Sequence, residues 1–141
     1  NQQCLISQKE TIVEFYEKNN IKNNIFEFDK NISKLILSSD LAITRCGAST
    51  TAELTYMLTP FIAVPLLNSI DNHQLINAKF YKNNGCCWLI EQEKFKEENL
   101  FNLIMEIMKN KNKLGNIRKN MEKISSKNVY KNIENELKEF I

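Results

Sequence analysis

One stretch constrains the fold of this chain more than any other: residues 40–53, with the sequence D-L-A-I-T-R-C-G-A-S-T-T-A-E. Residues 41–43 are an apolar run typical of a short buried strand, and residues 45–48 form a turn of small residues after Arg45. A helical pattern then begins at residues 49–51, and we expect Glu53 in its first turn. A strand that leads through a glycine turn to a helix N-terminus presents free N–H groups and the positive end of the helix dipole, which favours phosphate binding.

Apolar runs and amphipathic helical patterns alternate along most of the chain, which predicts an α/β fold with a Rossmann-like parallel sheet flanked by helices. Expected strands cover residues 2–6, 25–28, 41–44, 61–66 and 86–90; expected helices cover 9–18, 31–37, 49–58, 73–82, 97–108, 113–124 and 129–140. We interpret residues 1–141 as one domain, truncated at its N-terminus, with a helical tail from about residue 94.

Three polar loops follow expected strands, at residues 29–31, 45–50 and 68–74. Because the carboxyl ends of parallel strands meet at one edge of the sheet, we expect these loops to form one composite binding site.

Composition excludes several classes of function. The 141 residues are 43% hydrophobic and 26% charged, as in ordinary soluble domains, and the net charge of +2 is too small to indicate a nucleic-acid partner. No apolar run reaches the length of a membrane span. The four cysteines have no C-x-x-C spacing and the chain has one histidine, so we expect reduced, buried thiols in a cytoplasmic protein and no metal site.

Positive charge is concentrated toward the C-terminus. Residues 109–141 contain nine Lys or Arg against four Glu. A solvated helical face explains this bias, and peripheral contact with an anionic membrane is the alternative.

Glu53 has two possible roles. Thr50 and Glu53 have the spacing of a capping box, in which each side chain accepts a hydrogen bond from the other's backbone N–H. Alternatively, a diphosphate binds the helix N-terminus while the Glu53 carboxylate accepts hydrogen bonds from a ribose diol. Gly47 is either a plain turn residue or a site where phosphate approaches the backbone closely.

Side-chain amides gather in residues 69–74, with Asn77 one turn later, and amides both donate and accept as a polyhydroxyl ligand requires. Asp71 or Asn72 as a plain N-cap explains part of this cluster. Arg45 is suited to pair with a phosphate or with a carboxylate at the edge of the core. No nucleophile–base arrangement is visible in the sequence, and His73 has no acidic partner nearby in the chain.

The motifs S-D-L-A-I-T-R-C-G-A-S-T-T-A-E-L, T-P-F-I-A-V-P-L and D-N-H-Q-L-I-N-A resemble the C-terminal domain of the MurG family of peptidoglycan N-acetylglucosaminyltransferases. The resemblance runs from residue 2 to about residue 91. It implies the C-terminal half of an inverting GT-B glycosyltransferase with UDP-GlcNAc as donor, no cofactor and no metal. It further implies a lipid I acceptor bound through an N-terminal domain, which also holds the catalytic base, at the inner face of the bacterial membrane.

The resemblance also implies a role for each matching residue. The backbone at Phe28 and Asp29 would meet the uracil, with Asp29 where the family usually has an apolar residue. The Glu53 carboxylate would hold the ribose. Ala48, Ser49 and Thr50 would lie against the sugar and diphosphate, and His73 and Gln74 would contact the GlcNAc hydroxyls. Arg45 and Gly47 are predicted substrate contacts on the grounds given above, without a role taken from the family.

Two alternative functions share this pattern. One is a related glycosyltransferase subunit that uses another UDP-sugar and needs a separate membrane partner. The other is a non-catalytic module that binds sugar nucleotides.

Overall fold

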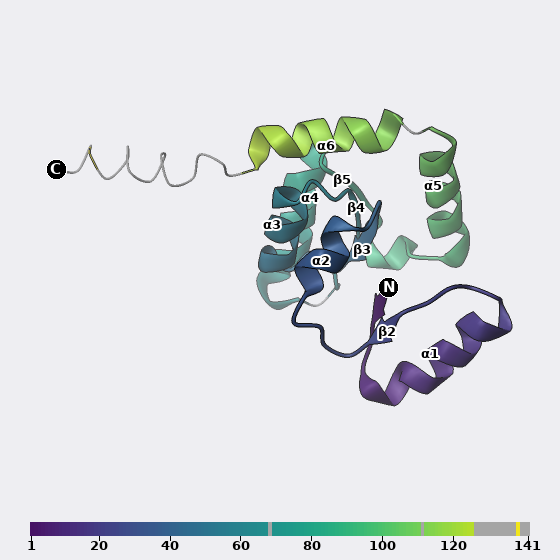
Figure 1. Ribbon diagram of the computed structural model, residues 1–141. Coiled ribbons are helices and arrows are strands. Elements are labelled where there is room, and N and C mark those ends of the chain that lie inside the picture. The colour runs from purple at the N-terminus through teal and green to yellow at the C-terminus, as the bar shows by residue number, and fades with distance from the viewer. Residues whose placement is uncertain (68, 111, 126–137, 139–141) are drawn as a thin grey trace. The chain divides into compact units, whose positions relative to one another are not determined.

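The computed structural model describes residues 1–67, 69–110, 112–125 and 138. The chain divides into two compact units, Asn1–Leu35 and Ile36–Ile141 (Figure 1). The helix expected over residues 129–140 lies outside the described residues apart from residue 138. No helix in the described ranges is long and apolar enough to cross a membrane.

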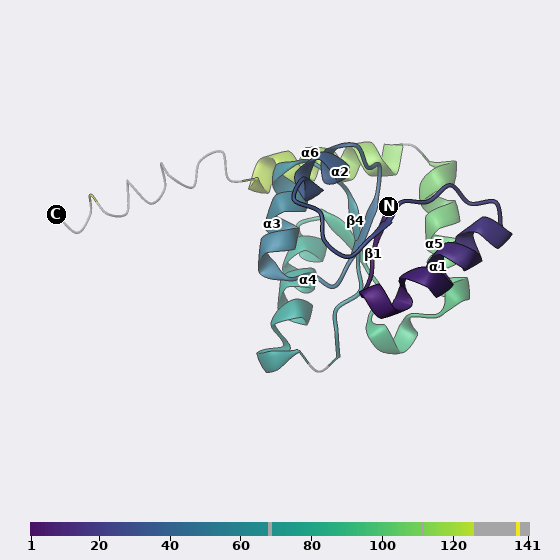
Figure 2. The same cartoon turned by 60° about the horizontal axis from the view of Figure 1, so that its bottom comes forward.

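The first unit is small and has little core of its own. β1 (Gln2–Gln3) pairs in parallel with β2 (Ile25–Phe26), and α1 (Ile6–Lys18) connects them (Figure 2). Ile25 is the buried residue of this unit, and α1 buries none of its side chains. α2 (Ile32–Leu37) spans the division between the units.

The second unit is built on a parallel sheet with the order β3-β4-β5. Helices α3 (Ala48–Tyr56) and α4 (His73–Asn83) connect these strands in turn, as the sequence predicts. The strands, β3 (Ala42–Thr44), β4 (Phe61–Ala63) and β5 (Cys87–Leu89), are shorter than expected. For β4 the reason is local, because Pro60 and Pro65 flank it and proline cannot donate to a sheet ladder.

β4 lies at the centre of the sheet and its side chains divide the core in two. Phe61 and Ala63 pack into one cluster, with Leu54 of α3 and Met121. Ile62, on the opposite face, packs into a second cluster with Val64, Ile90 and Ile107. A central strand of a parallel sheet is covered on both faces, which explains why Phe61, Ile62 and Ala63 are all fully buried.

All four cysteines are free. Cys46, Cys86 and Cys87 are buried as expected, whereas Cys4 is partly exposed. Burial raises the pKa of all three buried thiols, that of Cys46 to about 12, so they stay protonated near neutral pH.

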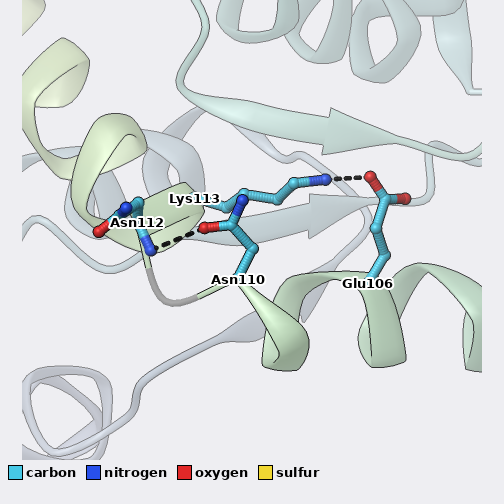
Figure 3. Close-up of polar contacts among 4 residues, drawn as sticks. All are labelled: Glu106, Asn110, Asn112 and Lys113. Carbon is cyan, nitrogen blue, oxygen red and sulfur yellow. Dashed lines mark hydrogen bonds and ion pairs between the residues drawn. The ribbon is translucent and has the colours of Figure 1, made fainter.

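Two helices follow the sheet, α5 (Glu97–Lys109) and α6 (Asn112–Ile124), after a short 3-10 helix, η2 (Gln92–Lys94), that the sequence pattern does not predict. Figure 3 shows the corner between them, where the Asn110 side-chain oxygen accepts a hydrogen bond from the Asn112 N–H at 3.2 Å. Lys113 forms an ion pair with Glu106 of α5 across the same corner.

α4 ends at Asn83, one residue later than expected. Gly85 has φ +67°, and its N–H bonds to the Lys82 carbonyl at 2.9 Å. The Gly85 carbonyl accepts a hydrogen bond from Asn120 of α6 at 3.1 Å, so this helix end is also anchored to α6.

Candidate functional site

Two of the three predicted polar loops lie at the carboxyl edge of the β3-β4-β5 sheet. Residues 45–47 lead from β3 to α3, and residues 64–72 lead from β4 through η1 (Ile70–Asn72) to α4. Parallel pairing places both loops at one edge, as expected. The third loop, residues 29–31, belongs to the first unit, and its place beside the other two stays a prediction.

The N-terminus of α3 carries no side-chain cap. The helix begins at Ala48, one residue earlier than expected, and Gly47 is its N-cap residue with φ −60° and ψ 145°. Since Thr51 N–H makes the first intrahelical bond, to the Gly47 carbonyl at 3.0 Å, the three preceding N–H groups of α3 lie free of acceptors within the described residues. They belong to Ala48, Ser49 and Thr50.

The capping-box reading of Thr50 and Glu53 is wrong. Because α3 begins at Ala48, Thr50 lies inside the first turn and Glu53 falls in the second. The side chain that bonds the start of the helix is Thr51, whose hydroxyl lies 3.1 Å from the Gly47 carbonyl and 3.0 Å from that of Ala48. The Glu53 side chain is exposed and makes no hydrogen bond or ion pair with any other described residue, so its carboxylate is available to a ligand.

Glycine at position 47 is not required by the fold. Its φ is one that any residue adopts, and a Cβ built on it meets no atom within 4 Å. Neither the backbone angles nor the space at Gly47 requires a glycine, although glycine is among the residues preferred at an N-cap. A Cβ at this position would point into open space beside the start of α3, so the backbone there is accessible to a phosphate.

Cys46 precedes Gly47 in the left-handed conformation, with φ 66°, and is fully buried. Its N–H donates to the Thr44 hydroxyl at 3.3 Å, and its carbonyl accepts from the Asn77 side-chain amide of α4 at 3.2 Å. With its pKa raised by burial, the neutral Cys46 thiol adds no negative charge beside the helix N-terminus.

Arg45 is exposed, and its guanidinium donates to the Val64 carbonyl at 3.3 Å. The expected carboxylate partner is not found among the described residues. A phosphate contact of Arg45 stays a prediction.

The loop before α4 is held by side chains and by an unusual backbone. Asp71 and Asn72 both have left-handed φ, 51° and 54°. Asn72 occupies the N-cap position of α4, as expected. Its side chain does not make the expected capping hydrogen bond. The Gln74 side-chain oxygen accepts from the Leu66 N–H at 2.9 Å, which leaves the Gln74 NH₂ as its donor group. His73 is the exposed first residue of α4.

A cavity of about 190 Å³ opens at the same edge, between the segments that follow β4 and β5. The Gln92 side-chain oxygen accepts from the Leu67 N–H at 3.1 Å and so joins the two segments. Residues 91–93 are part of the cavity lining, which the sequence does not predict because no local pattern links them to residues 65–67. The cavity is lined by Pro65, Leu66, Leu67, Asn72, Leu75, Glu91, Gln92 and Glu93.

The predicted uracil contacts lie in the first unit. Phe28 is 74% exposed. The Asp29 carboxylate accepts a hydrogen bond from the Asn31 N–H at 2.7 Å, so this side chain stabilises its own turn. Across the described residues, no three His, Cys, Asp or Glu side chains gather closely enough to hold a metal ion.

This arrangement, an open helix N-terminus beside amide-bearing side chains at the carboxyl edge of a parallel sheet, is typical of proteins that bind phosphorylated ligands. Residues 2–137 match the model of the glycosyltransferase family 28 C-terminal domain, and the chain belongs to this family. The predicted family and fold class are thereby confirmed.

Individual proteins that are similar to this chain support the same family assignment. A protein of Pelagibacter ubique is 39% identical over 88% of this chain, and one of Rickettsia bellii is 36% identical over 99%. Both are called UDP-N-acetylglucosamine–N-acetylmuramyl-(pentapeptide) pyrophosphoryl-undecaprenol N-acetylglucosamine transferase. The crystal structure of Acinetobacter baumannii MurG matches 97% of this chain with a TM-score of 0.83 and 25% identity. The chain spans 35% and 39% of the length of the two relatives and 42% of the MurG chain.

Proposed function

We propose that this chain is the UDP-GlcNAc-binding part of an inverting GT-B N-acetylglucosaminyltransferase, which moves GlcNAc onto lipid I to form lipid II. One observation carries the proposal: the N-terminus of α3, which follows Gly47, has no side-chain cap. The chain belongs to a family of glycosyltransferases, which makes a phosphate the expected ligand there. The names of the relatives supply the donor and the acceptor.

In this proposal the bound UDP-GlcNAc lies along α3, and its sugar reaches the start of α4. The diphosphate accepts hydrogen bonds from the N–H groups of the first turn of α3 and is attracted by the helix dipole. Glu53 lies about 4.5 Å further along the helix axis than Thr50, a separation that suits a ribose attached to the diphosphate. His73 and Gln74 at the start of α4 meet the GlcNAc hydroxyls, and the backbone at residues 28–29 meets the uracil.

In the proposed reaction an acceptor hydroxyl attacks the anomeric carbon opposite to the leaving UDP and inverts the configuration there. The bond from the anomeric carbon to the diphosphate oxygen breaks, and the α3 N–H groups stabilise the negative charge that develops on that oxygen. The proton of the attacking hydroxyl passes to a general base, which we assign to the N-terminal domain of the enzyme and not to this chain. We also infer that the diphosphate contacts the helix N-terminus without a metal ion and that the helix dipole offsets part of its charge.

A lipid-linked acceptor places the reaction at a membrane surface, which we propose to be the cytoplasmic face. We propose α6 as the contact with anionic lipid. The helix carries Lys113, Arg118, Lys119 and Lys123 against Glu122, and of these Lys113 and Arg118 also form ion pairs with Glu106 and Asp40. Co-sedimentation with phosphatidylglycerol vesicles tests this contact. Binding no stronger than to phosphatidylcholine vesicles would contradict it.

The proposed donor site is tested by an amide chemical-shift titration of the labelled chain with UDP-GlcNAc, using UDP-glucose and GDP-mannose as controls. We expect shifts confined to residues 28–29, 47–53 and 73–74, caused by the UDP-sugars and not by GDP-mannose, and unchanged by a chelator. A folded protein without shifts at millimolar UDP-GlcNAc would rule out this function for the chain. Equal shifts with GDP-mannose would rule out the uracil contact.

A further inference from the structure

The turn before α3, residues 45–47, is stabilised in part by a hydrogen bond from α4. Cys46 holds a left-handed φ of 66° without being a glycine, and residues with a Cβ adopt that conformation at an energetic cost. Two of the side chains that bond this turn, Thr44 and Thr51, belong to the same β3–α3 segment. The third is Asn77, which is 31 residues further along the chain in α4.

Asn77 connects this turn to the second loop of the site. Its side-chain amide donates to the Cys46 carbonyl at 3.2 Å. Asn77 is partly buried on α4, one helical turn after His73, and α3 and α4 lie in contact (Figures 1 and 2). Any shift of α4 relative to the turn must therefore stretch or break this hydrogen bond.

The direction of the Gly47 N–H follows from the same hydrogen bond. The Cys46 carbonyl and the Gly47 N–H belong to one planar trans peptide and point in opposite directions. Because the carbonyl is held toward Asn77, the Gly47 N–H points away from it. That N–H has no acceptor within the described residues, so it is available to a ligand together with the N–H groups of Ala48, Ser49 and Thr50.

We propose that Asn77 is a positioning residue of the donor site, which fixes the Gly47 peptide and the start of α3 for the diphosphate and holds them in register with the start of α4. This inference rests on the proposed function. It predicts that Asn77 affects affinity for the diphosphate, whether or not a sugar is attached. A residue that only contacted the sugar would affect UDP-GlcNAc and leave UDP unchanged.

Asn77→Ala and the nearly isosteric Asn77→Asp both remove the donor to the Cys46 carbonyl. Asn84→Ala is the matched control, because the Asn84 amide donates to the Phe80 carbonyl at 2.9 Å at the other end of the same helix. Affinities for uridine, UDP and UDP-GlcNAc are measured by shift titration of each folded variant. The amide shift of Gly47 is recorded without ligand.

We expect each Asn77 variant to weaken UDP and UDP-GlcNAc by one common factor. For Asn77→Ala this factor is about fivefold to tenfold, as for the loss of one hydrogen bond, and for Asn77→Asp it is larger because the carboxylate adds negative charge. Uridine affinity stays within about twofold, and Asn84→Ala binds as the wild type does. The ligand-free Gly47 amide shift changes in both Asn77 variants and not in Asn84→Ala.

Three results would overturn the inference alone: an unchanged UDP affinity, a loss confined to UDP-GlcNAc, or an unchanged Gly47 shift in the Asn77 variants. Failure of the folded wild-type chain to bind UDP would instead overturn the proposed function, and the positioning role with it. The two failures are distinguishable because the first three results require a wild type that binds.

Discussion

Gly47 shows at the level of one residue how ligand binding and folding make different demands. Its backbone angles are open to alanine and its surroundings have room for a Cβ. A glycine that folding does not need, at the N-cap of an uncapped helix, points to a demand made by a ligand.

Gly47→Ala is therefore expected to separate binding from stability. A slightly poorer N-cap and a less flexible unfolded chain nearly cancel, so the free energy of unfolding changes by less than about 1 kcal/mol. UDP affinity falls about tenfold or more, because the methyl group occupies space over the α3 N–H groups. Urea unfolding and a UDP titration measure the two effects. A variant that binds UDP like the wild type would remove the case for close approach at Gly47.

Glu53 is the residue to which the family resemblance assigns the ribose. Glu53→Gln keeps the shape of the side chain but weakens hydrogen bonds to a diol, since a carboxylate accepts more strongly than an amide. We expect UDP affinity to fall about tenfold with the circular dichroism spectrum unchanged. Glu98→Gln is the control, because Glu98 is also an exposed helical carboxylate, in the first turn of α5. Equal affinities of the Glu53 variant and the wild type would exclude the ribose contact.

At the level of the elements, the end of α4 has a left-handed conformation and a close contact that both favour glycine. Gly85 has φ +67°, and a Cβ there would lie 2.6 Å from the Asn120 side-chain nitrogen. The same side chain donates to the Gly85 carbonyl, so the helix end and its contact with α6 are linked.

Two substitutions to alanine in this region should have opposite signs. Gly85→Ala is expected to lower the free energy of unfolding by about 1–2 kcal/mol or more, from left-handed strain and the displaced Asn120. Gly115→Ala, inside α6 with nothing within 4 Å of its Cβ, is expected to raise it by about 0.5–1 kcal/mol. Urea denaturation of both variants measures the difference. A stabilised Gly85 variant would contradict this account of the helix end.

At the level of the whole molecule, the two units differ in what they bury. Ile25 is the buried residue of the first unit, whereas the second has core clusters on both faces of its sheet. Since burial of apolar surface is the main source of stability, the two units should open with different free energies.

Native-state hydrogen exchange tests this difference on matched strand amides. The Gln2 and Cys4 N–H groups, bonded at 2.9 and 3.0 Å, represent the β1–β2 pair; the Val64 and Ile90 N–H groups, bonded at 2.8 and 2.9 Å, represent the β3-β4-β5 sheet. We expect the first pair to exchange about tenfold faster or more, relative to intrinsic rates. Equal protection would show that the two units unfold together.

Much of the second unit was predictable because its signals are local. The apolar runs of β3, β4 and β5 and the helical patterns of α3 and α4 each depend on neighbouring residues, and each of these elements is confirmed. The errors also have local causes. α3 begins at Ala48 because glycine serves as its N-cap, and the expected Thr50–Glu53 capping box does not form.

The sequence by itself determined the α/β alternation, the parallel sheet and the family, because periodicity and short motifs depend on residues close together in the chain. Only the tertiary structure decided which side chains hold the site. Asn77 reaches Cys46 and Gln92 reaches Leu67 through hydrogen bonds that no short-range pattern encodes. Such contacts join segments that follow different strands, and they exist only once the sheet has brought the carboxyl ends of those strands together.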